Sequence, residues 1–128
     1  MSAHPFLLPA ACSGLLAVVL GAFGAHALKD SLELSMYTAY QTAVQYQFYH
    51  TLALLFVILA DAHLRHRVAK IACWGFFVGI VLFSGSLYLM AVTGERVLGM
   101  ITPLGGIAFI VGWAALVYAA FQQPSDRR

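Results

Sequence analysis

Charged residues are absent from four long stretches of this 128-residue sequence: residues 1–28, 34–60, 71–94 and 97–125. Each stretch exceeds the roughly 20 apolar residues that cross the hydrocarbon core of a bilayer. A soluble domain carries about a quarter charged residues and a polar face on every helix. Here 9% of the residues are charged and 62% are hydrophobic, which excludes a soluble globular domain, a disordered chain and a secreted disulfide scaffold. The sequence therefore predicts an all-α integral membrane protein, a four-transmembrane-helix bundle with short loops.

The polar links between the apolar stretches predict the bounds of the spans. The predicted spans lie at about residues 5–28, 41–60, 71–92 and 103–121. They use nearly the whole chain, so we expect a single membrane domain at residues 1–128. Residues 29–40 form a polar link that ends in aromatic residues, for which we expect an interfacial turn or short helix. Thr102 and Pro103 have the pattern of an N-cap followed by a proline at the first helical position.

The Lys and Arg residues outside the spans predict the orientation of the chain. Four spans place both termini and the middle link on one side of the membrane. That side holds Arg65, Arg67, Lys70, Arg127 and Arg128, and the other side holds Lys29 and Arg96. Because loops rich in Lys and Arg remain in the cytoplasm, we expect both termini to be cytoplasmic. The net charge of +2 is spread over short loops and forms no single patch, so nucleic acid is not an expected partner.

Small residues recur at alternating steps of three and four along the spans, as they do at the seam of a left-handed helix bundle. The seams read Ala10, Gly14, Ala17, Gly21 and Gly24 in the first span, Ala72, Gly75, Gly79, Leu82 and Ser86 in the third, and Gly105, Ala108, Gly112, Ala115 and Ala119 in the fourth. Small residues let helix backbones approach closely where no hydrophobic effect drives association. We expect these positions to pack helix against helix, and they could equally serve a homo-oligomer or a membrane-protein partner.

The second span differs because its seam contains large polar residues. This seam reads Ala39, Ala43, Tyr46, His50, Ala53, Val57 and Ala60. Tyr46 and His50 lie four residues apart, on one face of a helix. At 1.5 Å per residue, His50 lies roughly 13 Å from the predicted outer end of its span. A titratable side chain at that depth is destabilising unless it finds a partner.

Polar residues of the other spans fall in the same outer half of the predicted bundle, whereas the inner halves are almost purely apolar. The candidate polar cluster consists of His50, Tyr46, Gln47, His26, Ser84, Ser86 and Thr102. If the protein has a ligand pocket, we expect it between the helices in the outer half, around His50.

Four blocks of the sequence resemble those of a known family. They are residues 21–28 (GAFGAHAL), 46–50 (YQFYH), 82–88 (LFSGSLY) and 101–106 (ITPLGG). In this order they resemble the YgdD-like family of small bacterial inner-membrane proteins, catalogued as domain of unknown function 423. The resemblance covers about residues 10–120. It implies a four-helix, multi-pass protein of the bacterial inner (plasma) membrane, and it implies no established reaction, substrate or cofactor.

Three hypotheses for the function remain open. In the first, the protein is a structural or accessory membrane protein in which hydrogen bonds of His50 tie the helices together. In the second, it binds a small molecule, either a lipid, a quinone or, less readily, haem. His26 and His50 differ in depth by about 10 Å, which disfavours haem ligation by both. In the third, it is a small transporter or channel with a proton-coupled route through His50.

Catalysis and metal binding find little support in the residue pattern. The spans contain no carboxylate pair, and Cys12 and Cys73 form no C-x-x-C motif. His63 and His66 lie three residues apart without an evident third ligand. We therefore expect no enzyme activity, no metal and no cofactor, with the lipid bilayer as the principal partner.

Overall fold

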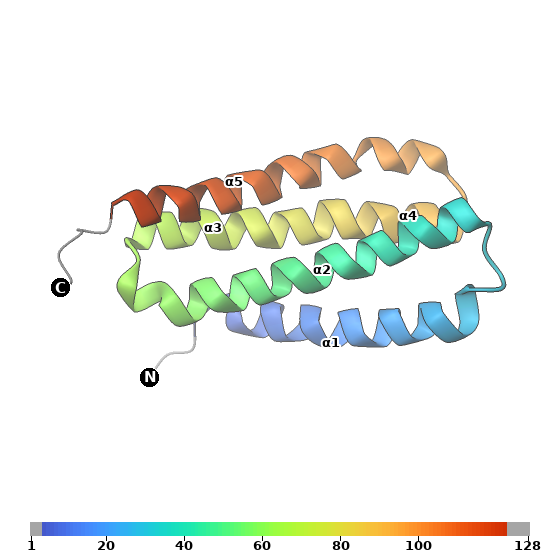
Figure 1. The fold of residues 1–128 in the computed structure, drawn as a ribbon, viewed down its shortest axis with the longest axis horizontal. Helices are drawn as coiled ribbons and strands as arrows, with labels where there is room; N and C mark the ends of the chain where they lie inside the picture. Colours follow the sequence, from blue (N-terminus) through green and yellow to red (C-terminus); the bar gives the residue numbers. More distant parts are fainter. Residues whose placement is uncertain (1–3, 123–128) are drawn as a thin grey trace.

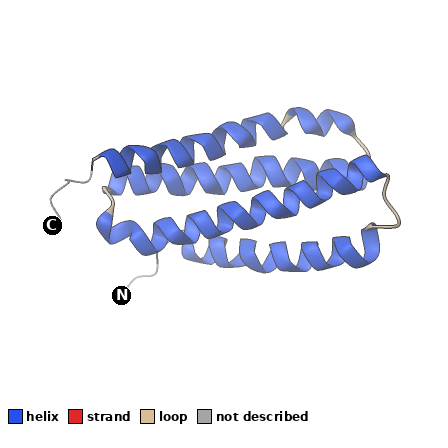
Figure 2. Ribbon diagram, in the orientation of Figure 1, coloured by secondary structure: helices blue, strands red, loops and turns tan. Residues whose placement is uncertain are grey.

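Helices make up nearly all of the part of the chain that the structure, a computed structural model, describes, namely residues 4–122 (Figure 1 and Figure 2). In chain order they are α1 (Leu7–Phe23), η1 (Gly24–Leu28), α2 (Leu34–Ala60), η2 (Asp61–His63), α3 (His66–Gly79), η3 (Ile80–Ser84), α4 (Gly85–Thr93), η4 (Arg96–Met100) and α5 (Thr102–Phe121). The segments η1 and η3 are π-helical, and η2 and η4 are 3-10 turns. Arg127 and Arg128, which entered the predicted orientation, lie outside the described residues.

Four helical rods in residues 4–122 are long and apolar enough to cross a bilayer. They run over Leu7–Leu28, Leu34–His63, His66–Thr93 and Arg96–Phe121. The same residues contain no β-strand. The predicted all-α architecture with four membrane-spanning helices is therefore confirmed.

The second span begins earlier than the sequence predicts. Residues 34–40, expected as an interfacial turn or a separate short helix, form the first turns of α2. Tyr40 is buried there, and its hydroxyl donates to the backbone carbonyl of Leu20 on α1 at 2.6 Å. Contacts of this kind with a neighbouring helix sustain a helical segment that its own propensity would not.

Thr102 is not the N-cap of the fourth span. Ile101 holds that position without a side-chain hydrogen bond, and Thr102 is the first residue of α5. The Thr102 hydroxyl lies 2.6 Å from the hydroxyl of Ser86, on α4. A hydroxyl held by a neighbouring helix is not available to cap the backbone of its own helix. Pro103 does stand in the first turn, where its missing N–H is tolerated.

Helix α2 and the rod formed by α3, η3 and α4 are central, whereas α1 and α5 lie outside. Figure 1 shows α1 running along α2 and α5 running along α3. In the most apolar stretch of each span, 39% of the residues are buried in the two central spans and 17% in the two peripheral spans. The outward surfaces of α1 and α5 are apolar, which suits a surface in contact with lipid chains.

Glycines bring the backbones of α3 and α5 into contact. A Cβ at Gly75 would lie 2.8 Å from both the carbonyl oxygen of Ala108 and the nitrogen of Gly112. A Cβ at Gly79 or Gly105 would likewise overlap a phenylalanine of the facing rod. These glycines already pack against other helices of the same chain. Self-association through them would require these helices to separate first.

The small residues of α1 face α2. Ala10 and Ala17 are buried, and a Cβ at Gly24 would overlap the ring of Tyr40. The contacts become looser from Gly24 back toward the start of α1. A Cβ at Gly21 would lie 3.3 Å from Val44, and a Cβ at Gly14 would lie 3.6 Å from Thr51. The first span therefore packs most closely at the end that leads into the link to α2.

The π-helical segment η3 changes which residues of the third span face inward. Steps of three and four from Gly79 predict Leu82 and Ser86 on the seam. In the structure the next buried residue after Gly79 is Ser84, five positions on, and Leu82 is only partly buried. A π turn accommodates one residue more than an α turn, and this extra residue explains the step of five.

Candidate functional site

His50 lies where α2, α3 and α5 meet, and it is 6% exposed. Its ring stacks on Phe109 of α5 with centroids 3.5 Å apart and planes inclined by 10°. The rings of Phe76 and Trp113 have centroids 5.8 and 6.1 Å from that of His50. Because α2 begins at Leu34, His50 is about 24 Å along its helix at 1.5 Å per residue. It therefore lies near the middle of the helical rod Leu34–His63.

Both ring nitrogens of His50 have a hydrogen-bond partner. The indole Nε1–H of Trp113 donates to Nε2 at 3.1 Å, and Nδ1 lies 2.8 Å from the backbone carbonyl oxygen of Tyr46. An indole N–H can only donate, so Nε2 carries no proton, and a carbonyl oxygen can only accept, so Nδ1 carries one. His50 is thus a neutral imidazole with a defined tautomer, and neither nitrogen is left for a further ligand.

Tyr46 lies at the edge of the cluster and not on the inward face predicted for it. Its side chain is 38% exposed and stacks on Phe83 with centroids 4.6 Å apart. The buried residue at this level is its neighbour Gln47, which is 4% exposed. The predicted seam residues Ala43, His50, Ala53 and Val57 are buried, so the inward face of α2 departs from the prediction at this level, where Gln47 takes the place expected for Tyr46.

Gln47 is the centre of a network that joins three spans. Its amide nitrogen donates to the backbone carbonyl of Ser13 on α1 at 2.9 Å, and its amide oxygen accepts from the hydroxyl of Tyr88 on α4 at 2.6 Å. The hydroxyl of Ser13 lies 2.7 Å from that of Thr51, one turn further along α2. These bonds join the peripheral helix α1 to the central helix α2.

The serines of the third span form two further links between helices. The hydroxyl of Ser84 donates to the backbone carbonyl of Ala43 on α2 at 2.7 Å. Ser86 pairs with Thr102 and also donates to the carbonyl of Phe83, one turn earlier, at 3.0 Å. Ser84, Ser86 and Thr102 therefore connect the second half of the third span to both α2 and α5.

His26 does not join the cluster. It is exposed in η1, at the outer end of the first span. The hydrogen bonds of His50 come from α2 and α5 only. The structure thus keeps the two histidines apart and gives no common site for a group that both would ligate.

Hydrogen bonding inside the cluster is complete. Within residues 4–122, Oε1 of Gln122 is the one buried side-chain nitrogen or oxygen without a partner, and it lies after the end of α5. The buried polar side chains of the cluster are His50, Gln47, Thr51, Ser84 and Ser86, and each is bonded. A polar ligand would have to replace bonds that already exist.

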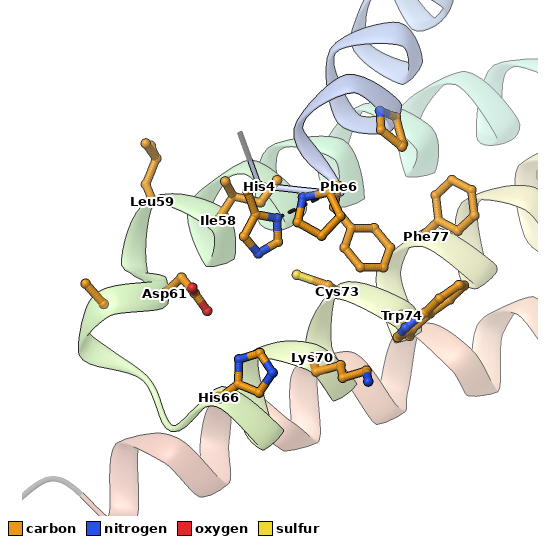
Figure 3. A pocket seen from close by; sticks show the side chains of 13 residues that line it. His4, Phe6, Ile58, Leu59, Asp61, His66, Lys70, Cys73, Trp74 and Phe77 are labelled. Atoms are coloured by element: carbon orange, nitrogen blue, oxygen red, sulfur yellow. Dashed lines mark hydrogen bonds between the residues drawn. The ribbon is translucent and has the colours of Figure 1, made fainter. Parts of the chain in front are cut away.

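A cavity of about 1100 Å³ lies at the opposite end of the bundle from the predicted pocket (Figure 3). It opens between the start of α1, the end of α2 and the start of α3. A cavity of about 150 Å³ lies at the other end of the bundle, beside Gly24 and Tyr40 and between η1 and α2. His50 lines neither of these two cavities, and the rings of Phe109, Phe76 and Trp113 pack around its imidazole.

Several residues of the cluster are absent from the predicted set, among them Ser13, Thr51, Phe109 and Trp113. Ser13 and Thr51 are single hydroxyls within apolar runs, and a polar group inside a span generally needs a partner. Trp113 stands near the middle of its span, away from the interfaces where tryptophan is enriched. Its N–H therefore needed an acceptor, which was an available signal. Phe109 carries no comparable signal.

No group of three or more His, Cys, Asp or Glu side chains could hold a metal ion in the described part of the chain. Cys73 is buried in α3, and Cys12 is exposed on α1. Neither cysteine is therefore part of a recognisable metal centre.

Four membrane-spanning helices, joined by short turns and cross-linked by polar side chains, define a multi-pass membrane protein of the α-helical class. Comparison with known families places this protein more narrowly. The chain belongs to the family described as "Protein of unknown function (DUF423)", whose model matches residues 20–106. The resemblance carried by the four sequence blocks is thereby confirmed.

Relatives from several bacteria match along nearly their whole length. The UPF0382 membrane protein YwdK of Bacillus subtilis is 48% identical over 116 residues, which are 90% of this chain and 94% of the relative. The UPF0382 inner membrane protein YgdD of Escherichia coli is 38% identical over 125 residues, 95% of this chain and 93% of the relative. A UPF0382 membrane protein of Haemophilus influenzae is 40% identical over 122 residues, 95% of this chain and 98% of the relative. No solved structure matches this chain significantly.

Proposed function

We propose that this chain is a non-enzymatic, structural or accessory protein of the bacterial inner membrane. In this proposal the polar cluster around His50 and Gln47 holds the four spans in one arrangement and does not bind a substrate. Polar side chains in a membrane interior associate helices where the hydrophobic effect between them is absent.

The observation that carries this proposal is the complete hydrogen bonding of His50. Nε2 accepts from Trp113, Nδ1 donates to the carbonyl of Tyr46, and Phe109 covers one face of the ring. Haem ligation requires a free imidazole nitrogen, and a quinone carbonyl requires a free donor. One nitrogen of His50 bonds a neighbouring helix and the other bonds its own helix, and this arrangement supports a structural role instead.

The orientation of the chain in the membrane is part of the same proposal. Both termini lie in the cytoplasm, with the middle link between α2 and α3 on the same side. This is supported by the basic residues Arg65, Arg67 and Lys70 near that link. The Escherichia coli relative is named an inner membrane protein, which supports the location in the inner membrane.

A comparison of wild-type protein with His50→Asn in mild detergent tests the proposal. Absorbance spectra, solvent extraction and native mass spectrometry report bound haem, quinone and other small molecules. We expect His50→Asn to lower the thermal midpoint, and we expect no stoichiometric haem or quinone in either protein. A haem or quinone that is present at one equivalent in the wild type and lost in His50→Asn would overturn the structural role.

A further inference from the structure

The cavity at the inner end of the bundle exists because the first span is short there. Figure 1 shows α1 starting short of the level at which α2 ends. Pro5 precedes the start of α1 at Leu7, and the residue before a proline is disfavoured in the helical conformation. The chain at His4 therefore does not continue α1, and α2 and α3 remain partly uncovered at this end.

The walls of this cavity change from polar to apolar along its length. Asp61, His66 and Lys70 lie at the end of the bundle, whereas Trp74 and Phe77 lie one to three turns further along α3 (Figure 3). Phe6 extends the apolar wall from α1, packing edge-on against Trp74 with ring centroids 5.1 Å apart. An occupant of matching polarity has a charged end and an apolar body, as a membrane lipid has.

The position of the cavity relative to the bilayer fits a lipid. Asp61 and His66 border the short link between the second and third spans, which is the level of the lipid headgroups. Trp74 and Phe77 lie inside the third span, at the level of the acyl chains. A headgroup held at Asp61 and Lys70 would thus direct its chains along the aromatic wall.

The polar end of the cavity offers both signs of charge. Lys70 supplies a cation, and Asp61 supplies a carboxylate. Within residues 4–122 the ion pair of the structure joins Arg96 and Glu33 at the other end of the bundle, so Asp61 and Lys70 are not paired with each other. Among the described residues neither side chain has an ion-pair partner, and a ligand that carries the complementary pair of charges would bind both.

This charge pattern discriminates among common headgroups. An ethanolamine headgroup has a phosphate for Lys70 and a primary ammonium whose N–H groups can donate to Asp61. A glycerol headgroup has the phosphate but leaves the Asp61 carboxylate without a counter-charge. A choline headgroup has a cation, but its quaternary nitrogen has no N–H to donate. Of these three headgroups, ethanolamine is therefore the one that satisfies both side chains.

We propose that the cavity between α1, α2 and α3 binds one phospholipid with an ethanolamine headgroup, with its phosphate at Lys70, its ammonium at Asp61 and an acyl chain against Phe6, Trp74 and Phe77. This site is separate from the polar cluster around His50. A result against the lipid site would therefore not contradict the structural role proposed for that cluster, and the reverse also holds.

Native mass spectrometry of the full-length protein tests this site. The protein in mild detergent is mixed with equal amounts of phosphatidylethanolamine, phosphatidylglycerol and phosphatidylcholine that carry identical acyl chains. We expect one molecule of phosphatidylethanolamine to be retained, with a preference of about tenfold, the effect of one charge-assisted hydrogen bond. Equal retention of the three lipids would overturn the proposal.

The chain supplies matched control variants for the two charges. Asp61→Asn should remove the preference for ethanolamine over glycerol headgroups, and Lys70→Gln should weaken the retention of both. Glu33→Gln and Arg96→Gln make the same chemical changes at the opposite end, where both side chains are exposed, and should leave retention unchanged. Equal losses in test and control variants would show a general effect of charge and would contradict the site.

Tryptophan fluorescence in nanodiscs gives a second readout that does not depend on detergent. Trp74 lines the cavity, so phosphatidylethanolamine with brominated chains should quench the protein more strongly than brominated phosphatidylglycerol at equal mole fraction. Trp74→Phe should abolish this difference between headgroups. Quenching that is the same for both headgroups in the wild type would overturn the proposal.

Discussion

The indole Nε1–H of Trp113 donates to Nε2 of His50 across 3.1 Å, joining α5 to α2 inside the membrane-spanning part of the bundle. This bond sets the tautomer of His50, because the proton must then lie on Nδ1, where the carbonyl of Tyr46 accepts it. The peripheral helix α5, which packs mainly on α3, is thereby tied to α2 by a polar contact.

Replacing Trp113 with phenylalanine should destabilise the protein through this contact. Trp113→Phe keeps an aromatic ring but leaves Nε2 of His50 buried without a donor, at a cost of about 1–2 kcal/mol in the free energy of unfolding. Equilibrium unfolding in mixed detergent micelles measures this change. Trp74→Phe is the control, since that indole lies at the cavity and donates to no residue in the described part of the chain; equal losses in both variants would contradict the role of the bond.

Gln47→Ala should loosen the attachment of α1. The substitution removes the bonds to Ser13 and Tyr88 and leaves the hydroxyl of Tyr88 buried without its acceptor. We expect a loss of about 2 kcal/mol in the free energy of unfolding. Gln45→Ala, on the exposed side of the same helix, should change it by less than about 0.5 kcal/mol. Proteolysis should also cleave the link between α1 and α2 faster in Gln47→Ala alone.

Adding one methyl group at Gly75 should disturb the bundle more than adding it elsewhere. In Gly75→Ala the Cβ would lie 2.8 Å from backbone atoms of α5, so the two helices must separate, at a cost of about 1–3 kcal/mol. Gly85 has helical dihedral angles and nothing within 4 Å of an added Cβ. Gly85→Ala should therefore raise the thermal midpoint slightly, through helix propensity. A lower thermal midpoint for Gly85→Ala would contradict the open space found around this position.

Both termini should be found in the cytoplasm. A fluorescent protein that matures only in the cytoplasm should be bright when fused to the C-terminus of the full chain and dark when fused after Gly94, in the link on the opposite side. Replacing Arg65, Arg67 and Lys70 together with glutamine should reduce the contrast between the two fusions, because these residues supply the basic bias. A bright fusion after Gly94 would reverse the proposed orientation.

The architecture is predictable from sequence because a membrane imposes it so strongly. Apolar runs of this length have few alternatives to a spanning helix, since backbone groups in hydrocarbon must bond within their own segment. The glycines at 75, 79, 105 and 112 are identifiable for a related reason, because close helix approach in lipid favours small residues. These signals are local and need no knowledge of which helices are neighbours.

The details of the polar cluster are not predictable in the same way. Gln47, and not Tyr46, lies inward because its amide bonds Ser13 and Tyr88, and where these residues lie on other helices cannot be read from the sequence of α2. The position of the cavity depends on where α1 starts relative to α2, which the apolar pattern does not reveal. Trp113 becomes visible as a partner of His50 only when the fourth span is placed beside the second.

The segment η3 gives the third span two different faces on a single axis. One extra residue in a turn rotates everything after it by about 100° relative to a regular helix. Before the segment, α3 lies mainly against α5; after it, α4 lies mainly against α2. One continuous rod thus packs against two different neighbours, as two separate short helices would. Its backbone hydrogen bonds stay within the rod, in a region where no water could replace them.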